Sequence, residues 1–169
     1  MNYKICKFIL PILLIFITDS AHAAISLGFN PEPQSGNIIN IGVTISGLNS
    51  GSTPSLSTYD LDINFDDSHL TFASATFGDP VLGNQLDLLN FGSNPASTIL
   101  TGPGILNMFE LSLDSVSDLE NLQAGSFTLA TLSFDVLSAG TSQIALVINA
   151  LADAEGNALS ANTATASIT

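Results

Sequence analysis

Apolar and polar residues alternate along most of the chain that follows residue 23. The clearest case is the segment TYDLDINF, residues 58–65, whose apolar positions are Tyr59, Leu61, Ile63 and Phe65. Its polar positions are Asp60, Asp62 and Asn64. Because successive side chains of a strand point to opposite faces, this alternation predicts a strand with one buried side and one side facing solvent.

Similar short runs, rich in β-branched and aromatic residues, recur along the chain and are separated by clusters of Gly, Pro, Asn, Asp and Ser. They predict strands at 24–29, 38–48, 58–65, 70–77, 105–114, 126–137, 142–151 and 158–168. The less regular segment 79–104 predicts a long loop that carries one more strand, and 117–123 predicts a single helical turn. The pattern indicates an all-β fold, a jelly-roll-like antiparallel β-sandwich of two sheets and about nine strands.

The first 23 residues have a different character. Lys4 and Lys7 precede the apolar run FILPILLIFI, and Ala21-His22-Ala23 has the small-x-small pattern of a cleavage site. This arrangement is typical of a secretory signal peptide, and the apolar run is too short to span a bilayer. The sequence therefore predicts a signal peptide at 1–23, a single domain at 24–169, and a secreted or cell-envelope location.

Charge is distributed very unevenly along the chain. The two basic residues, Lys4 and Lys7, and the single cysteine, Cys6, all lie in the predicted signal peptide. Of the 15 acidic residues only Asp19 lies there, which leaves 14 carboxylates and one histidine, His69, in the predicted domain. Without Lys or Arg to neutralise phosphate, nucleic acid and anionic lipid surfaces are excluded as partners. Without cysteine, the domain must be stabilised by its core.

Two acidic groups are weak candidates for calcium ligands. Asp60 and Asp62 open a D-x-D-x-N pattern like that of an EF-hand loop, but Phe65 stands where that loop requires Gly. Strand residues two apart also lie about 7 Å from each other on one face, which is far for joint ligation. A solvated outer face is therefore the favoured interpretation of this group.

The second acidic group is the run Asp153-Ala-Glu155-Gly-Asn157. Gly156 and Asn157 tolerate positive φ, so the favoured interpretation is a hairpin turn. Oxygen ligands are abundant there and nothing basic competes for them, so calcium stays open as a low-ranking alternative and no other cofactor is expected.

Catalytic chemistry finds little support in the sequence. Glu110 and Asp114 are expected to point outward on FELSLD and could form a glycosidase pair, but any acidic β protein offers such pairs. Arg, Lys and Trp, which orient sugars or stabilise developing charge, are absent after residue 23. A Ser-His-Asp site has only the His69 imidazole in its favour, since no G-x-S-x-G turn is present. The sequence predicts a protein that is not an enzyme.

Two blocks of the sequence resemble the cohesin domain family. FDDSHLTFASATFGDPVLG resembles the aromatic-Asp-Pro-x-x-Leu block of cohesin-like domains through Phe65, Asp66, Leu70 and Gly78, with Asp67 where the family has Pro. FTLATLSFDVLSAGTSQIAL resembles a later block, a strand followed by a Gly-containing hairpin. Its matching residues are Leu129, Ala130, Thr131, Leu132, Phe134 and Gly140. The resemblance spans most of residues 25–160.

The resemblance implies a secreted sandwich, related to carbohydrate-binding modules, that binds a calcium-loaded dockerin through one sheet face. The family's contact residues have no one-by-one match here, so the partner-binding residues stay unknown. The sequence is also similar to cohesin-like proteins that end in a Pro-Glu-Pro sorting tail, and this tail is absent after ASIT. Two functions follow as hypotheses: association with a dockerin-like protein, or a structural or adhesive role in an extracellular polysaccharide matrix with weak or calcium-assisted carbohydrate binding.

Overall fold

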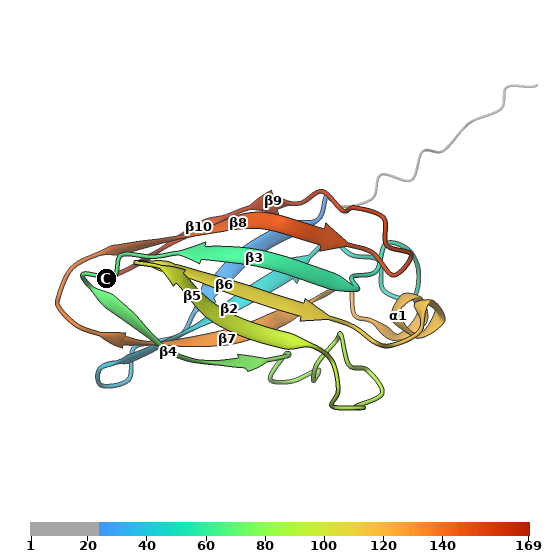
Figure 1. Ribbon diagram of the computed structural model, residues 1–169, viewed down its shortest axis with the longest axis horizontal. Helices are drawn as coiled ribbons and strands as arrows, with labels where there is room; N and C mark the ends of the chain where they lie inside the picture. Colours follow the sequence, from blue (N-terminus) through green and yellow to red (C-terminus); the bar gives the residue numbers. More distant parts are fainter. Residues whose placement is uncertain (1–23) are drawn as a thin grey trace, which may run out of the picture.

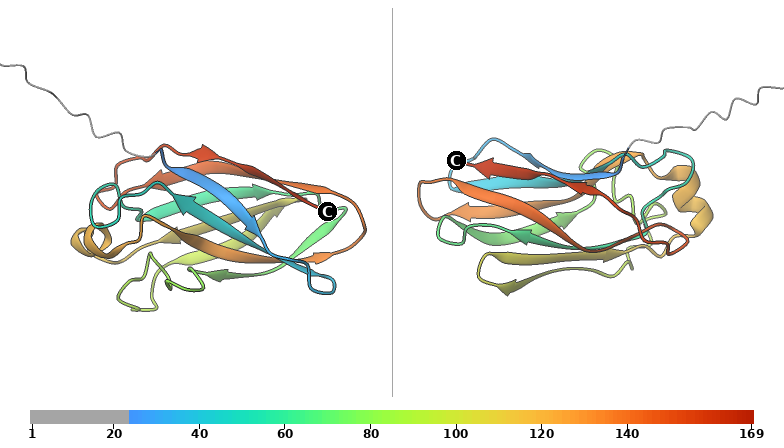
Figure 2. Two further views of the ribbon diagram at one scale, coloured as in Figure 1. Left: turned by 180° about the vertical axis from the view of Figure 1, so that it is seen from behind. Right: turned by 90° about the horizontal axis from the view of Figure 1, so that it is seen from above.

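Two five-stranded β-sheets pack face to face in the computed structural model, which describes residues 24–169 (Figures 1 and 2). Sheet A has the strand order β4-β7-β2-β1-β9, and sheet B has the order β10-β8-β3-β6-β5. Neighbouring strands are antiparallel except for β1 and β9, which are parallel. The all-β two-sheet sandwich is confirmed, while the predicted signal peptide lies outside the described residues.

Ten strands and one short helix make up the fold. The strands are β1 (Ser26–Pro31), β2 (Ile38–Ser46), β3 (Thr58–Asn64), β4 (Leu70–Phe77), β5 (Ala96–Gly102), β6 (Ile105–Leu111), β7 (Ser126–Val136), β8 (Ser142–Ala152), β9 (Asn162–Thr163) and β10 (Thr165–Ile168). The helix is α1 (Val116–Leu122). Within residues 24–169 no helix has the length and apolarity needed to cross a membrane.

Two segments differ in detail from the sequence prediction. The expected extra strand in 79–104 is present as β5, at the edge of sheet B. The single strand expected at 158–168 is instead divided at Ala164, whose N–H donates to the Leu27 carbonyl. Before this residue β9 pairs with β1 in sheet A, and after it β10 pairs with β8 in sheet B. The C-terminal segment therefore joins the two layers.

The core lies between the sheets and follows the predicted alternation. Tyr59, Leu61 and Ile63 of β3 are fully buried, as the sequence predicts. Opposite them, the Phe134 ring packs edge-on against Phe65 and Phe72, with ring centroids 5.0 and 5.9 Å away. A buried Phe or Leu side chain stabilises a fold by about 1.5–3 kcal/mol relative to an exposed one. This core therefore carries most of the stability.

Helix α1 closes one end of the sandwich and is longer than the expected single turn. It begins at Val116 because the Ser115 side chain accepts a hydrogen bond from the backbone N–H of Asp118, while the Asp118 carboxylate accepts from the Ser115 hydroxyl. Leu119 is buried, so the helix is fixed to the core by one apolar side chain.

The long loop 78–95 crosses from the end of β4, the edge of sheet A, to the start of β5, the edge of sheet B. In Figure 1 it hangs at the lower right, close to α1. Buried polar side chains hold this loop in place.

Candidate binding surface

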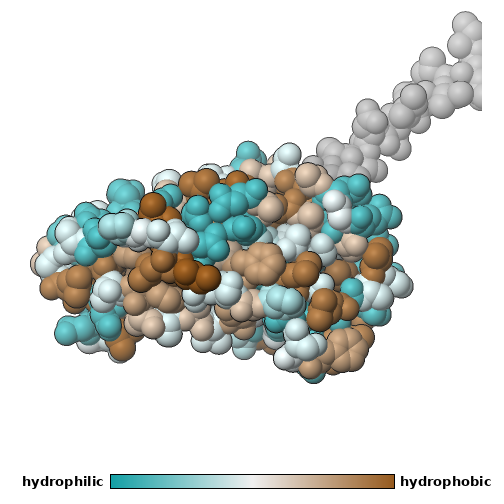
Figure 3. Space-filling model, in the orientation of Figure 1, coloured by the Kyte–Doolittle hydropathy of each residue, from teal (hydrophilic) through white to brown (hydrophobic). Residues whose placement is uncertain are grey.

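The outer faces of the two sheets differ in chemistry. Sheet A presents small polar side chains to solvent, including Ser26, Asn40, Thr44, Thr128, Thr131 and Ser133. Sheet B exposes large apolar side chains, with Ile99 at 58%, Val147 at 47% and Leu111 at 36% exposure. Figure 3 shows this face of sheet B, with hydrophobic side chains gathered over β5 and β6 and hydrophilic ones over β3. An exposed apolar face of this kind is the usual mark of an interaction surface.

Strand register aligns these residues in rows across sheet B. Val147 of β8 lies opposite Asp62 of β3, which lies opposite Asn107 of β6, which lies opposite Ile99 of β5. With strands about 4.8 Å apart, this row spans roughly 15 Å. Two exposed apolar side chains therefore flank a polar centre, and we call this set of residues the central row.

The neighbouring row carries the second carboxylate. Asp60 lies between Ala150 of β8 and Phe109 of β6, and Ser97 of β5 lies beyond Phe109. The Phe109 ring is partly exposed on this outer face. Together the two rows form a patch in which the two acidic side chains of β3 lie among apolar side chains of β8, β6 and β5.

Two amides hold the carboxylates of Asp60 and Asp62. The Asn107 Nδ2 donates to Asp60 Oδ1 at 2.6 Å and to Asp62 Oδ1 at 2.9 Å, and the Asn149 Nδ2 donates to Asp60 Oδ1 at 3.2 Å. Asn149 reaches this position because β8 carries one extra residue opposite the Asp60–Leu61 step, a β-bulge. The outward orientation of both acids is as the sequence predicts, and the two asparagines were not foreseen.

The second group of predicted calcium candidates forms the turn after β8. Asp153 Oδ1 accepts hydrogen bonds from the backbone N–H groups of Glu155 and Asn157 at 3.0 and 2.8 Å. The Asn157 Nδ2 donates to the carboxylates of Asp153 and Glu155 at 3.1 and 3.3 Å. Gly156 adopts a φ of +84°, as this turn requires. These contacts account for the acids as turn residues.

No three acidic, histidine or cysteine side chains converge as a metal group within residues 24–169. Asp60 and Asp62 sit on β3, whereas Asp153, Glu155 and Asn157 sit in the turn after β8, so the two groups remain separate. Calcium binding by either group stays a prediction.

Glu110 points into the core, so the expectation that it faces outward is wrong. It lies opposite Tyr59 in the β3–β6 pair and is 1% exposed. The Tyr59 hydroxyl donates to Glu110 Oε2 at 2.9 Å, and the Asn84 Nδ2 donates to Oε1 at 2.6 Å. Glu110 thereby ties the loop 78–95 to sheet B. Asp114, the other residue of the supposed glycosidase pair, accepts the Leu88 N–H at 2.7 Å and also supports this loop.

Burial raises the pKa values of both Glu110 and Tyr59, which are hydrogen-bonded to each other. Desolvation raises the pKa of Glu110, although the hydrogen bonds from Asn84 and Tyr59 lower it, and the nearby charge of Asp87 raises it further. Burial also raises the pKa of Tyr59 well above its usual value, and the Glu110 charge adds to this effect. A buried carboxyl that only receives hydrogen bonds, with no cation nearby, is a structural anchor whose ionisation is costly.

Asp79 holds the start of the same loop. Its Oδ1 accepts the backbone N–H groups of Val81 and Leu82 at 2.8 and 2.9 Å, and its Oδ2 accepts the Thr128 N–H at 2.8 Å. Burial alone would raise the pKa of Asp79, but the hydrogen bonds from Leu82, Thr128 and Val81 outweigh it and lower the pKa. The Asp79 carboxylate thus links the loop that follows β4 to the neighbouring strand β7 of sheet A.

Replacing Asp79 by Ala is expected to lower the free energy of unfolding by about 1–2 kcal/mol, since three backbone donors lose their partner. Because the pKa of Asp79 is lowered in the folded state, its contribution is present above the unfolded pKa and is lost as the pH falls through the folded one. Urea unfolding at pH 7 and pH 3 measures this: the difference between wild type and variant should shrink at pH 3. An equal difference at both pH values would contradict the role of the charge.

Gln123, just after α1, joins three backbone groups inside the protein. Its side chain is 1% exposed. The Oε1 accepts the Leu56 N–H at 2.6 Å, while the Nε2 donates to the carbonyls of Leu56 and Gln85 at 2.8 and 2.9 Å. In return, Gln85 Oε1 accepts the Ala124 N–H at 2.9 Å. These two glutamines connect α1, the loop 78–95 and the segment that enters β3.

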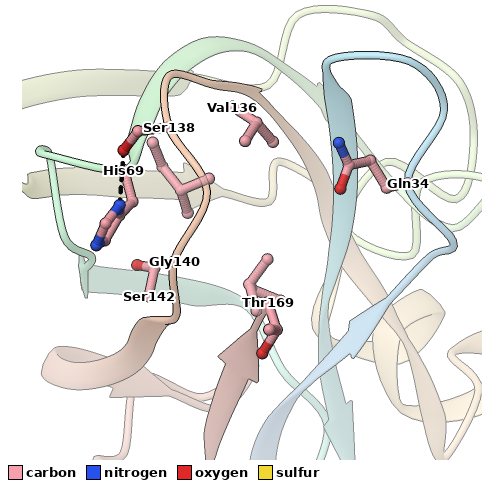
Figure 4. Close-up of a pocket in the computed structure, with 9 residues that line it drawn as sticks. Gln34, His69, Val136, Ser138, Gly140, Ser142 and Thr169 are labelled. Carbon is pink, nitrogen blue, oxygen red and sulfur yellow. Dashed lines mark hydrogen bonds between the residues drawn. The ribbon is translucent and has the colours of Figure 1, made fainter.

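A small cavity of about 20 Å³ lies at the opposite end of the sandwich (Figure 4). The His69 Nδ1 is 2.8 Å from the Ser138 Oγ, and this hydroxyl donates to the Ser68 carbonyl at 3.1 Å. Because the Ser138 hydroxyl donates its proton to the Ser68 carbonyl, the His69 Nδ1–H donates to the Ser138 oxygen. The Asp66 Oδ2 is 4.0 Å from the His69 Nε2. The cavity has room for about one water molecule. A Cβ on Gly140 would lie 2.3 Å from the His69 ring, so this glycine lets the imidazole pack. These contacts join the segment before β4 to the loop between β7 and β8.

A two-sheet antiparallel sandwich with apolar side chains exposed on one outer face is an arrangement that many binding modules share. Within this class the match is specific: a family model for the cohesin domain covers residues 24–169. The chain belongs to the cohesin domain family. None of the curated proteins matches it.

Solved structures of cohesins share this fold. The sixth cohesin of scaffoldin B from Acetivibrio cellulolyticus, solved in complex with a mutant Cel5 dockerin, has a TM-score of 0.68 at 18% identity, covering 87% of this chain and 99% of that one. A type I cohesin–dockerin complex from Clostridium thermocellum has a TM-score of 0.65 at 16% identity, covering 86% and 97%. A non-cellulosomal cohesin from the archaeon Archaeoglobus fulgidus has a TM-score of 0.61 at 16% identity, covering 86% and 89%.

Proposed function

We propose that this chain is a secreted, non-catalytic cohesin module that binds a dockerin-type protein through the outer face of sheet B. The observation that carries the proposal is the contrast between the two outer faces. Ile99 and Val147 are about half exposed in one row across sheet B, whereas the outer side of sheet A is mostly Ser, Thr and Asn. Burying exposed apolar area is the main driving force of protein association.

Family membership supports the same proposal. Cohesins of similar fold were solved in complexes with dockerins, and the signal-like segment 1–23 suits a module that acts outside the cell. The polysaccharide alternative has one aromatic candidate on the outer face of sheet B, the partly buried Phe109, and lacks the broad aromatic platform that sugar rings stack on. Protein binding is therefore the better supported function.

Affinity capture tests this proposal. Residues 24–169 are immobilised and exposed to the secreted and envelope fraction of the source organism, first with calcium and then with EDTA. The expected result is one protein that elutes with EDTA and whose sequence carries duplicated calcium loops. Recovery of polysaccharide alone, or of nothing, would overturn the dockerin-type proposal.

A pair of matched variants locates the binding face. Val147→Asp adds a carboxylate to the outer face of sheet B, and Thr76→Asp adds one to the outer face of sheet A. We expect the first to weaken binding of the captured protein at least tenfold, since it places a charge in an apolar contact, and the second to change it less than twofold. Isothermal titration calorimetry measures both dissociation constants. A reversed order of the two effects would assign binding to sheet A.

A further inference from the structure

Strand β5 ends sheet B with a free backbone edge. In Figure 1 it is the lowest strand of the front sheet, where it pairs with β6 on one side. The Leu111 N–H donates to the Pro95 carbonyl, so Pro95 and every second residue after it direct their backbone groups toward β6. The N–H and carbonyl groups of Ala96, Thr98 and Leu100 therefore point away from β6. In the described part of the chain these groups have no hydrogen-bond partner.

The edge of β5 is left open to the addition of another strand. Natural sheets shield such edges with charged side chains, proline, a bulge or a very short strand. Residues 96–100 are uncharged, contain no proline and pair with β6 in regular register, and the bulge of this strand comes only after Leu100. The other edges differ: a bulge between Phe72 and Ser74 interrupts β4, β9 has two residues and β10 has four. Strand addition therefore fits β5 best.

The sequence of β5 is complementary to its own reverse. When two copies of the segment ASTIL are aligned antiparallel, Ala96 lies opposite Leu100, Ser97 opposite Ile99, and Thr98 opposite Thr98. A small side chain thus meets a large one on either side of a central threonine pair, and threonines pair favourably across strands. Ile99 and Leu100 are 58% and 51% exposed, and this alignment covers part of both side chains.

Charge also favours this edge for contact between two copies. Residues 24–169 carry 14 carboxylates and neither Lys nor Arg, so most of the surface repels a second copy. Strand β5 and the outer face of β6 are uncharged, and the first carboxylates on that face, Asp60 and Asp62, lie on β3, two strands inward. Copies joined at β5 keep these acids about 24 Å apart, roughly three Debye lengths at physiological salt.

We infer that two copies of this chain pair through β5 and form a reversible dimer with two-fold symmetry and one continuous ten-stranded sheet. The interface holds six backbone hydrogen bonds, because Ala96, Thr98 and Leu100 of each copy all donate an N–H and accept at a carbonyl. The contact area is small, which is typical of a weak, transient interface. The inference goes beyond the proposed function and does not depend on it.

Sedimentation velocity of residues 24–169, at roughly 10 µM to 1 mM protein, tests the inference. The wild type should shift from monomer to dimer over this range, and more strongly at high salt, because salt screens the repulsion between the acidic copies. Thr98→Pro removes the central outward N–H but no hydrogen bond to β6, so it should weaken association at least tenfold. Ala75→Pro makes the same change at an outward N–H of β4 and should alter association less than twofold.

An introduced cysteine locates the interface, because residues 24–169 contain none. Thr98 lies on the two-fold axis, with its Cα about 5.5 Å from the same atom of the second copy. Thr98→Cys should therefore form a disulfide-linked dimer in the presence of oxidised glutathione. Ser97→Cys is the matched control. Its Cα lies about 8 Å from that of its own copy, which is too far for a disulfide, so this variant should crosslink at least tenfold more slowly.

Three results would overturn the inference. The first is a wild type that stays monomeric up to about 1 mM. The second is a dimer that tolerates Thr98→Pro, and the third is a Ser97→Cys variant that crosslinks as fast as Thr98→Cys, since the contact would then lie elsewhere or in another register. Circular dichroism shows whether each variant is folded. If Thr98→Pro does not fold, the comparison of the two cysteine variants decides.

Discussion

Replacing Gln123 by Ala is expected to destabilise the fold by about 3 kcal/mol or more, because each buried backbone group left without a partner costs about 1–3 kcal/mol. Three such groups depend on this one side chain: the N–H and carbonyl of Leu56 and the carbonyl of Gln85. They belong to segments far apart in the sequence, so no local rearrangement replaces the lost hydrogen bonds. Urea unfolding at pH 7 gives the difference in free energy directly.

The exposed Gln143 of β8 provides the matched control for Gln123. Its side chain donates to the Ser167 hydroxyl at the surface, where water can replace the lost partner. Gln143→Ala should therefore cost less than about 0.5 kcal/mol. If Gln123→Ala cost no more than this control, water would be filling the space that the larger side chain leaves, and the three-way contact would have little energetic weight.

Substitutions of Glu110 are expected to produce the second large effect on the free energy of unfolding, and two variants should differ in this effect. Glu110→Ala leaves the Tyr59 hydroxyl and the Asn84 amide without their acceptor inside the protein, at a cost of about 2–4 kcal/mol. Glu110→Gln keeps the shape and one acceptor but removes the buried charge. The two variants together separate the hydrogen bonds of this carboxyl from its ionisation.

The pH dependence of the Glu110→Gln variant follows from the raised pKa of Glu110. A carboxyl whose pKa is higher in the folded state binds its proton more tightly there, so it stabilises the fold most below the unfolded value of 4.5. That stabilisation is lost as the pH rises through the folded pKa. The stability of the Gln variant relative to wild type should therefore increase from pH 4.5 to pH 7.

Urea midpoints measured across this pH range test the expectation for Glu110. The exposed Glu155, in the turn after β8, supplies the control, because its side chain lies outside the core. Parallel profiles for Glu110→Gln and wild type would show that Glu110 titrates as an ordinary carboxyl and is not the anchor described above.

The sequence predicts most strands because their alternation is clear. Leu61 and Ile63 share one phase of β3 with no apolar residue in the other phase, so the buried side is unambiguous. The segment ALSANTATASI at 158–168 has almost only small residues in both phases. Nothing in it distinguishes a buried side, and the division into β9 and β10 depends on pairing with β1 and β8.

The candidate site was predictable only in part, for a related reason. In ILNMFEL, Leu106 and Met108 occupy one phase while Ile105 and Phe109 occupy the other, so alternation does not decide which way Glu110 points. The contacts of Asp60 with Asn107 and Asn149 depend on strand register and on a bulge in β8. Both are set by tertiary packing between segments far apart in the sequence, which local pattern does not encode.

The arrangement of the central strands also sets a time order for folding. In sheet A, β2 pairs with β7, and in sheet B, β3 pairs with β8, so each sheet joins a strand from the first half of the domain to one from the second half. Forming such distant pairings costs the entropy of closing a long loop before any contact stabilises the fold. Proteins built from such pairings therefore fold slowly. A chain still under synthesis at residue 122 already contains β1 beside β2 and β6 beside β3, but it lacks β7 and β8, which flank β2 and β3 on the other side. Neither sheet can therefore be completed until β7 and β8 have been synthesised.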